Sequence, residues 1–143
     1  MTRILILTLI IISLSGTSVP DKPLPIQAEA HRPKLIKLGE FKTTAYCSCV
    51  KCCGIWSAKH PSRIDTAYIQ RTNSGTIPTA SRTVSVDPDV IPLGTVLIID
   101  GHEYIAEDTG SAVKGKVIDI YFDSHKLAVE YGVQKKIIYI KGD

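Results

Sequence analysis

Apolar and polar positions alternate most clearly at residues 82–86 and 117–122. This alternation places successive side chains on opposite faces of an extended backbone, so each stretch predicts a β-strand. Two more runs, at 95–99 and 102–107, flank the pair Asp100-Gly101, which is typical of a tight hairpin. Residues 40–46 and 134–140 are expected to supply a first and a last strand.

Turn-forming residues separate these strands and leave room for little helix. Ser124 can cap a short helix that ends at Gly132. Residues 47–54 predict a compact loop, and residues 57–81, which are rich in turn formers, predict a long surface excursion. About six short strands with one or two short helices predict an all-β fold, closed into a barrel because closure protects the strand edges.

The first residues have the pattern of an export signal. Arg3 precedes the apolar run Ile4–Ile12, which fades into small polar residues and is shorter than the roughly 20 residues that cross a bilayer. We expect a signal peptide at residues 1–18, a proline-rich linker at 19–38 and one folded domain at 39–143. The mature protein would then lie in the cell envelope or outside the cell, without stable membrane insertion.

The composition narrows the range of partners. A formal charge of +3 over 143 residues is small and scattered, whereas a nucleic-acid surface needs clustered basic residues. We expect no nucleic-acid partner. We also expect a monomer that uses no cofactor.

All four cysteines fall in one short motif, formed by Cys47, Cys49, Cys52 and Cys53. In an exported protein this predicts two disulfides, and we expect each to join one of the first two cysteines to one of the last two, because a vicinal bridge is strained. A tetrahedral thiolate metal site and redox chemistry are the alternatives. The separated C-x-x-C pairs of common zinc sites are missing, so no metal is expected.

Three aspartates are the candidates for chemistry. Asp119 lies within a predicted strand and shares a face with Val117 and Tyr121, Asp108 follows a strand, and Asp87 precedes a proline. Burial and a neighbouring carboxylate both raise the pKa of an aspartic acid, which allows it to donate a proton at neutral pH. The alternative is that Asp87 and Asp108 only cap turns.

Several motifs in this order resemble the 3D (Asp-Asp-Asp) domain of bacterial cell-wall proteins, which the small stationary-phase survival muralytic proteins share. More remotely, the chain is similar to the catalytic barrel of membrane-bound lytic transglycosylase A. The similar motifs are Thr44–Cys47, Arg82–Pro88, Val90–Thr95, Glu107–Gly110 and Val117–His125. The resemblance implies a double-psi β-barrel that acts on peptidoglycan.

The resemblance also implies a lytic transglycosylase reaction, in which one acid cleaves the bond between N-acetylmuramic acid and N-acetylglucosamine and leaves a 1,6-anhydro end. It identifies Asp119 as the acid, supported by Asp108 and Asp87. We expect Thr109, Gly110, Lys114 and Tyr121 to contact the glycan. A non-catalytic glycan-binding barrel is the second hypothesis, and a cysteine-based metal or redox protein is the third.

Overall fold

The structure is a computed structural model that describes residues 34–142. The predicted signal peptide and most of the predicted linker therefore lie outside the described residues. Among residues 34–142, no helix has both the length and the apolar character that a membrane crossing requires. The described residues form six strands and two short α-helices, with two 3₁₀ turns.

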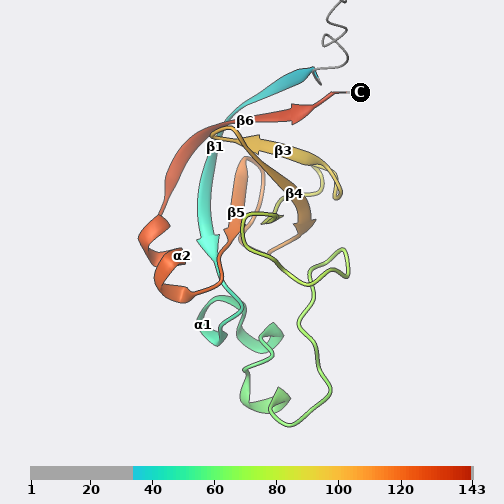
Figure 1. The fold of residues 1–143 in the computed structure, drawn as a ribbon, viewed down its shortest axis with the longest axis vertical. Coiled ribbons are helices and arrows are strands. Elements are labelled where there is room, and N and C mark those ends of the chain that lie inside the picture. Colours follow the sequence, from blue (N-terminus) through green and yellow to red (C-terminus); the bar gives the residue numbers. More distant parts are fainter. Residues whose placement is uncertain (1–33, 143) are drawn as a thin grey trace, which may run out of the picture. The chain divides into compact units, whose positions relative to one another are not determined.

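The strands are β1 (Leu35–Tyr46), β2 (Thr83–Ser85), β3 (Val96–Ile99), β4 (His102–Asp108), β5 (Val117–Tyr121) and β6 (Gln134–Lys141). The helical segments are α1 (Val50–Cys53), η1 (Gly54–Trp56), η2 (Pro61–Arg63) and α2 (His125–Tyr131). The strands pair in the order β1-β5-β2-β4-β3-β6, and β6 pairs again with β1, so the sheet closes into a barrel (Figure 1). The predicted β-rich class and number of strands are confirmed.

The sheet combines parallel and antiparallel pairs. β1 runs parallel to β5, and β2 runs parallel to β4, while the remaining neighbours are antiparallel. Asp119 of β5 is paired with Thr44 of β1 on one side and with Ser85 of β2 on the other. Ser85 is in turn paired with Asp108 of β4. The sheet therefore brings two of the predicted aspartates to one place.

An apolar core fills the barrel. Its ten buried residues come from all six strands and from the turn after β2, and they are Phe41, Val84, Val86, Ile91, Leu97, Ile99, Ala106, Ile118, Ile120 and Ile138. On β5 the isoleucines at 118 and 120 face this core, while Asp119 faces away from it, as the alternation predicts. Burial of one such side chain contributes about 1.5–3 kcal/mol to folding.

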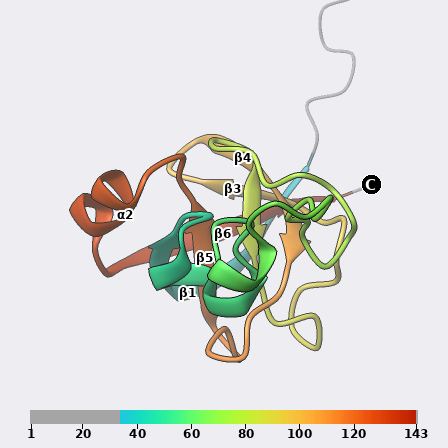
Figure 2. The ribbon, with the colours of Figure 1, turned by 90° about the horizontal axis from the view of Figure 1, so that it is seen from below.

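The chain leaves the barrel after β1 and returns at β2, and we call this connection, residues 47–82, the excursion. It contains α1, η1 and η2, and none of these three segments has a buried residue. Figure 1 shows the excursion below one end of the strands, and Figure 2 shows it from below, across that end. The predicted long excursion is confirmed.

Two boundaries differ from the sequence prediction. β1 begins at Leu35, inside the segment expected to be linker, because residues 35–37 pair with β6. The loop predicted at residues 47–54 contains the single turn α1. The helix predicted after Ser124 is present, and the Ser124 hydroxyl accepts a hydrogen bond from the backbone N–H of Leu127.

Candidate functional site

A cleft of about 600 Å³ lies between the barrel and the excursion. The barrel contributes Tyr46, Ser85, Asp108 and Asp119 to its lining. The excursion contributes residues 52, 53, 56 and 70–73, and the loop after β4 contributes residues 109–111 and 113. Both regions of the molecule are therefore needed to form the cleft.

Asp119 is one of two half-buried acids in this cleft, the other being Asp108. Its Oδ1 accepts a hydrogen bond of 2.7 Å from the hydroxyl of Thr44, on the adjacent strand. Burial raises the pKa of Asp119, the Thr44 hydrogen bond lowers it, and the nearby charge of Asp108 raises it, with a net upward shift. The Asp119 carboxyl therefore keeps its proton to a higher pH than a free aspartic acid, and it lines the cleft.

Asp108 is held in one orientation by three donors. Its Oδ2 accepts a hydrogen bond of 2.9 Å from the Tyr46 hydroxyl, and its Oδ1 accepts two, each 2.9 Å long, from the backbone N–H groups of Asn73 and Thr109. Burial, and then the charge of Asp108, raise the pKa of Tyr46, so its hydroxyl stays a donor. The hydrogen bond from Asn73 also links the excursion to strand β4 of the barrel.

Asp87 lies apart from the other two aspartates: Asp108 and Asp119 line the cleft, and Asp87 does not. Its carboxylate accepts hydrogen bonds from the backbone N–H groups of Gly115, at 2.7 Å, and Asp89, at 3.3 Å. The Gly115 bond is the main reason that the pKa of Asp87 is lowered, and the Lys114 ammonium 3.9 Å away acts in the same direction. Asp87 thereby orders the loop before β5.

The four residues expected to contact a glycan divide into two pairs. Thr109 and Gly110 line the cleft, whereas Lys114 and Tyr121 are not in its lining. Lys114 is mostly exposed and faces Asp87. The Tyr121 ring packs edge-on against Tyr46, with ring centroids 5.3 Å apart, and its hydroxyl lies 3.3 Å from the Ser48 hydroxyl.

Sequence reasoning missed the buried carboxylate of Glu107. It accepts a hydrogen bond of 2.6 Å from Arg82 and one of 2.7 Å from the Thr83 hydroxyl. The pairing of β2 with β4 skips Glu107, since Val84 pairs with Ala106 and Ser85 with Asp108, and Glu107 is not in the cleft lining. Glu107 therefore joins β2 to β4 where the excursion returns to the barrel.

The cleft lining also includes excursion residues that no sequence pattern singled out for a site. Trp56 is largely exposed, and Gln70, Arg71 and Asn73 follow it along the same wall. An exposed indole ring beside amide and guanidinium groups suits a polar ligand with flat apolar faces. The length of the excursion was one signal for these residues, and the similarity of residues 71–75 to a segment of the 3D domain was another.

The predicted disulfides are absent from the described residues, where Cys47, Cys49, Cys52 and Cys53 are all free. The sulfurs of Cys47 and Cys52 are 3.7 Å apart, far beyond a bond of about 2.05 Å. The thiol of Cys53 points elsewhere and donates to the carbonyl of Cys47 at 3.1 Å. Three of the thiols instead gather around His125, which sequence reasoning left without a partner.

Comparison with known proteins places part of the chain in a family. Residues 82–141 match the family described as the 3D domain. The chain is 44% identical over 62 residues to the putative cell wall shaping protein YabE of Bacillus subtilis, a match that covers 43% of this chain and 15% of that protein. It is 42% identical over 55 residues to the cell wall-binding protein YocH of the same organism, covering 38% and 19%. The match thus spans less than a fifth of either relative.

Solved structures of two lytic transglycosylases also align with part of the chain. MltA from E. coli aligns with a TM-score of 0.46 and 20% identity, over 54% of this chain and 29% of MltA. LtgG of Burkholderia pseudomallei aligns with a TM-score of 0.45 and 25% identity, over 52% and 27%. The match of residues 82–141 to the 3D domain agrees with the resemblance drawn from the motifs.

Proposed function

We propose that the cleft binds peptidoglycan glycan strands and cleaves them as a lytic transglycosylase. The observation that supports this proposal is the pair of carboxyls in one open cleft. One is half-buried with a raised pKa, and the other is held by three donors. The names of the two relatives, a cell wall shaping and a cell wall-binding protein, support the same substrate class.

In the proposed reaction, the Asp119 carboxyl gives its proton to the oxygen that links N-acetylmuramic acid to N-acetylglucosamine. As that bond breaks, C1 of the muramic ring gains positive charge, and the Asp108 carboxylate stabilises it. Asp119, now a base, takes the proton of the C6 hydroxyl as that oxygen attacks C1. The new bond closes a 1,6-anhydro ring, no water is consumed, and Asp119 is protonated again.

Asp119 suits the acid role better than Asp108 because of their hydrogen bonds. Among the described residues, the Asp119 carboxyl accepts one side-chain hydrogen bond, on Oδ1, and lines the cleft. Asp108 accepts three, distributed over both oxygens, and is fixed as a charged neighbour. We assign Asp87 an indirect part, because it orders the loop that continues from Thr109 and Gly110 to Gly115.

The test is product analysis by mass spectrometry after digestion of purified peptidoglycan. Asp119→Asn should lower the yield of anhydromuramyl products by about 10²–10⁴-fold, the usual contribution of general acid–base catalysis. Asp123→Asn is the matched control, because this aspartate is exposed and outside the cleft. Near-normal product yield from a folded Asp119→Asn protein would refute the assignment.

A glycan-binding module without catalysis is the second candidate, favoured by the relative named a cell wall-binding protein. The two candidates separate in one experiment. Both predict that the protein sediments with insoluble peptidoglycan. Only the enzyme also releases anhydromuramyl ends, so binding without any such product would decide for the module.

The proposal also includes the barrel topology, the export and the oligomeric state of the protein. We infer that the closed barrel has the double-psi topology, that residues 1–18 direct export, and that the protein works as a monomer in the cell envelope. Peptide mapping of the protein recovered from the medium and cell wall would locate its N-terminus. Sedimentation analysis would give its oligomeric state.

A further inference from the structure

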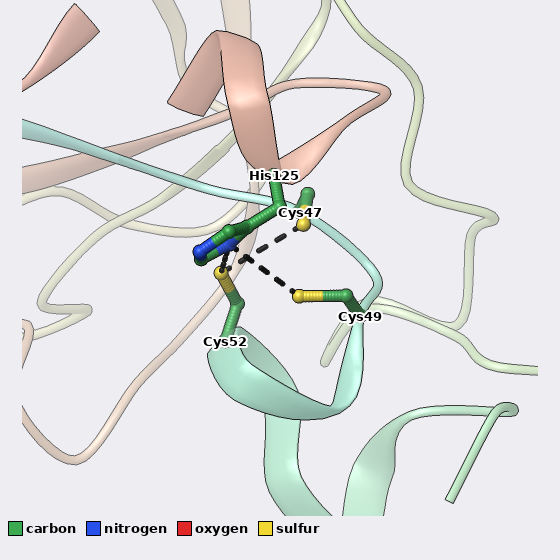
Figure 3. Close-up of side chains that lie close together, drawn as sticks. All are labelled: Cys47, Cys49, Cys52 and His125. Carbon is green, nitrogen blue, oxygen red and sulfur yellow. Dashed lines mark hydrogen bonds between the residues drawn. The ribbon is translucent and has the colours of Figure 1, made fainter. Parts of the chain in front are cut away.

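Three thiols and one imidazole converge where the excursion leaves the barrel. We call Cys47, Cys49, Cys52 and His125 the Cys3His cluster; their sulfur and nitrogen atoms all lie within 4.8 Å of one another. Figure 3 shows the four side chains pointing to a common centre. The three cysteines lie within six residues of the sequence. His125 is the first residue of α2 and comes 73 residues after Cys52.

The distances within the cluster match a tetrahedral metal site. Zinc bonds of about 2.3 Å to sulfur and about 2.0 Å to nitrogen place two sulfurs about 3.8 Å apart, and a sulfur and a nitrogen about 3.5 Å apart. The sulfurs of Cys47 and Cys52 are 3.7 Å apart. The Nδ1 of His125 is 3.6 Å from the sulfur of Cys49 and 3.5 Å from that of Cys52.

Hydrogen bonding alone explains this arrangement less well. Two thiols approach the same ring nitrogen, Nδ1 of His125. A neutral imidazole nitrogen has one lone pair, so it can accept a proton from only one of them. The sulfurs of Cys47 and Cys52 are 3.7 Å apart, so these two residues are not joined as a disulfide. A cation at the centre satisfies all four groups at once.

Local structure explains why these four residues meet. Cys47 follows β1 directly and is buried, and Cys49 is the N-cap of α1. The turn of α1, closed by the hydrogen bond of 3.2 Å from the N–H of Cys52 to the carbonyl of Cys49, brings these two side chains to one side. Cys53, the next residue, points away from the cluster.

We propose that the Cys3His cluster binds one Zn²⁺ ion with four protein ligands. Sulfur-rich tetrahedral sites with an imidazole suit zinc, and a site with four protein ligands and no open position is structural rather than catalytic. Binding would displace the protons of the three thiols, which bind the metal as thiolates. The proposal replaces the disulfides and the absence of metal that the sequence led us to expect.

The zinc ion would link the excursion to α2. Because α1, η1 and η2 bury no residue, the apolar core does not hold them. Cys52 is at once a ligand and part of the cleft lining, and Cys53 and Trp56 follow on the same wall. The metal would therefore fix one wall of the cleft, and its presence is testable whether or not the cleft cleaves glycans.

Metal analysis of the purified full chain tests the proposal. We expect one zinc per chain, removable by a chelator, in protein purified without added thiols or chelators. Cys49→Ser should lower zinc affinity by more than about 100-fold, beyond the usual effect of losing an outer-shell contact. Cys53→Ser is the matched control and should keep the full zinc content, since this thiol lies outside the cluster.

A second pair of variants keeps the test decisive if Cys49→Ser fails to fold. His125→Cys should retain a metal. When cobalt replaces zinc in this variant, the absorption spectrum should shift toward that of a site with four thiolates. His125→Ala should lose the metal. Three outcomes would overturn the proposal: zinc well below one per chain, equal loss of zinc in Cys53→Ser and Cys49→Ser, or a mass showing that the native cysteines are joined as disulfides.

Discussion

The barrel and the excursion are stabilised in opposite ways. In the barrel, Val84, Ile118 and Ile138 are completely buried. In the excursion, Ile55 and Ile69 are more than half exposed, and the ordered contacts are polar. The barrel wall of the cleft is therefore held by apolar packing. The excursion wall is held by hydrogen bonds, stacking and, in our proposal, a metal ion.

The excursion has a small polar network of its own. The Arg63 guanidinium lies 3.6 Å from the centroid of the Tyr68 ring, and its Nε donates to the carbonyl of Ile55 at 2.7 Å. The Tyr68 hydroxyl donates to the carbonyl of Trp56 at 3.0 Å. These contacts join residues within the excursion, so they shape it without anchoring it to the barrel.

The largest expected effect is on the free energy of unfolding, and it should differ between the two regions because of burial alone. Ile118→Ala should lower the free energy of unfolding by about 2–5 kcal/mol, because it leaves a cavity in the core. Ile69→Ala, the same kind of truncation at an exposed site of the excursion, should change it by less than about 0.5 kcal/mol. Urea denaturation of both variants measures the difference, and similar losses would contradict the comparison.

A smaller effect is expected at Glu107, where the excursion rejoins the barrel. Glu107→Gln removes the charged partner of Arg82 and Thr83 and should cost about 1–3 kcal/mol in the free energy of unfolding, since Arg82 is partly exposed. Glu103→Gln, on the same strand but in an exposed pair with Lys141, should cost less than about 1 kcal/mol. Equal effects of the two changes on thermal unfolding would argue against a special role for the buried carboxylate.

A still smaller and local effect is expected inside the excursion. Arg63→Ala removes a stacking contact of about 0.5–1 kcal/mol, so amide hydrogen exchange around residues 55–68 should accelerate while the midpoint of global unfolding stays the same. Lys59→Ala, at an exposed neighbour, serves as the control. A clear fall in global stability would mean that the excursion and the barrel unfold together.

The smallest effect concerns a single hydrogen bond in the cleft. The Thr44 hydroxyl lowers the pKa of Asp119 and opposes the upward shift caused by burial. Since the acid must carry its proton, activity should fall as pH rises through this pKa, and Thr44→Val should move that fall to higher pH. Thr43→Val, on the opposite face of β1, should leave the pH profile in place. An unchanged profile in Thr44→Val would remove Asp119 as the titrating group.

The raised pKa of Asp119 also has a consequence for stability. A carboxyl whose pKa is higher in the folded state than in the unfolded state stabilises the fold below the unfolded value, and this contribution is lost as pH rises through the folded value. Above its folded pKa, the ionised Asp119 carboxylate therefore lowers the stability of the fold. Asp119→Asn should unfold at the same or a higher temperature than the unchanged protein at pH 7, as calorimetry would measure.

Strands and faces could be predicted from the sequence because they depend on neighbours in the chain. The alternation around Asp119 was enough to place it opposite the core isoleucines. The meeting of Asp108 with Asp119 depends on the pairing of both strands with β2, which periodicity does not encode, although the family resemblance suggested it. The separate position of Asp87 depends on a hydrogen bond to Gly115, 28 residues away.

The cysteine motif shows where the structure departs from the sequence prediction. Four neighbouring cysteines in a chain expected to be exported favoured disulfides, and the missing second C-x-x-C pair argued against a metal. The fourth group of the cluster is His125, 76 residues after Cys49. Only the closed sheet, which carries α2 to the end of β1, brings it into reach.

The arrangement of β5 ties correct folding to the position of Asp119. Ile118 and Ile120 flank Asp119, so a slip of one residue against β1 would push the carboxylate into the apolar interior and turn both isoleucines outward. No partly correct pairing of this strand keeps either the core or the acid in place. The proposed cleavage of glycans, measured on a refolded sample, would thus report the fraction of molecules in which β5 is paired in the native register.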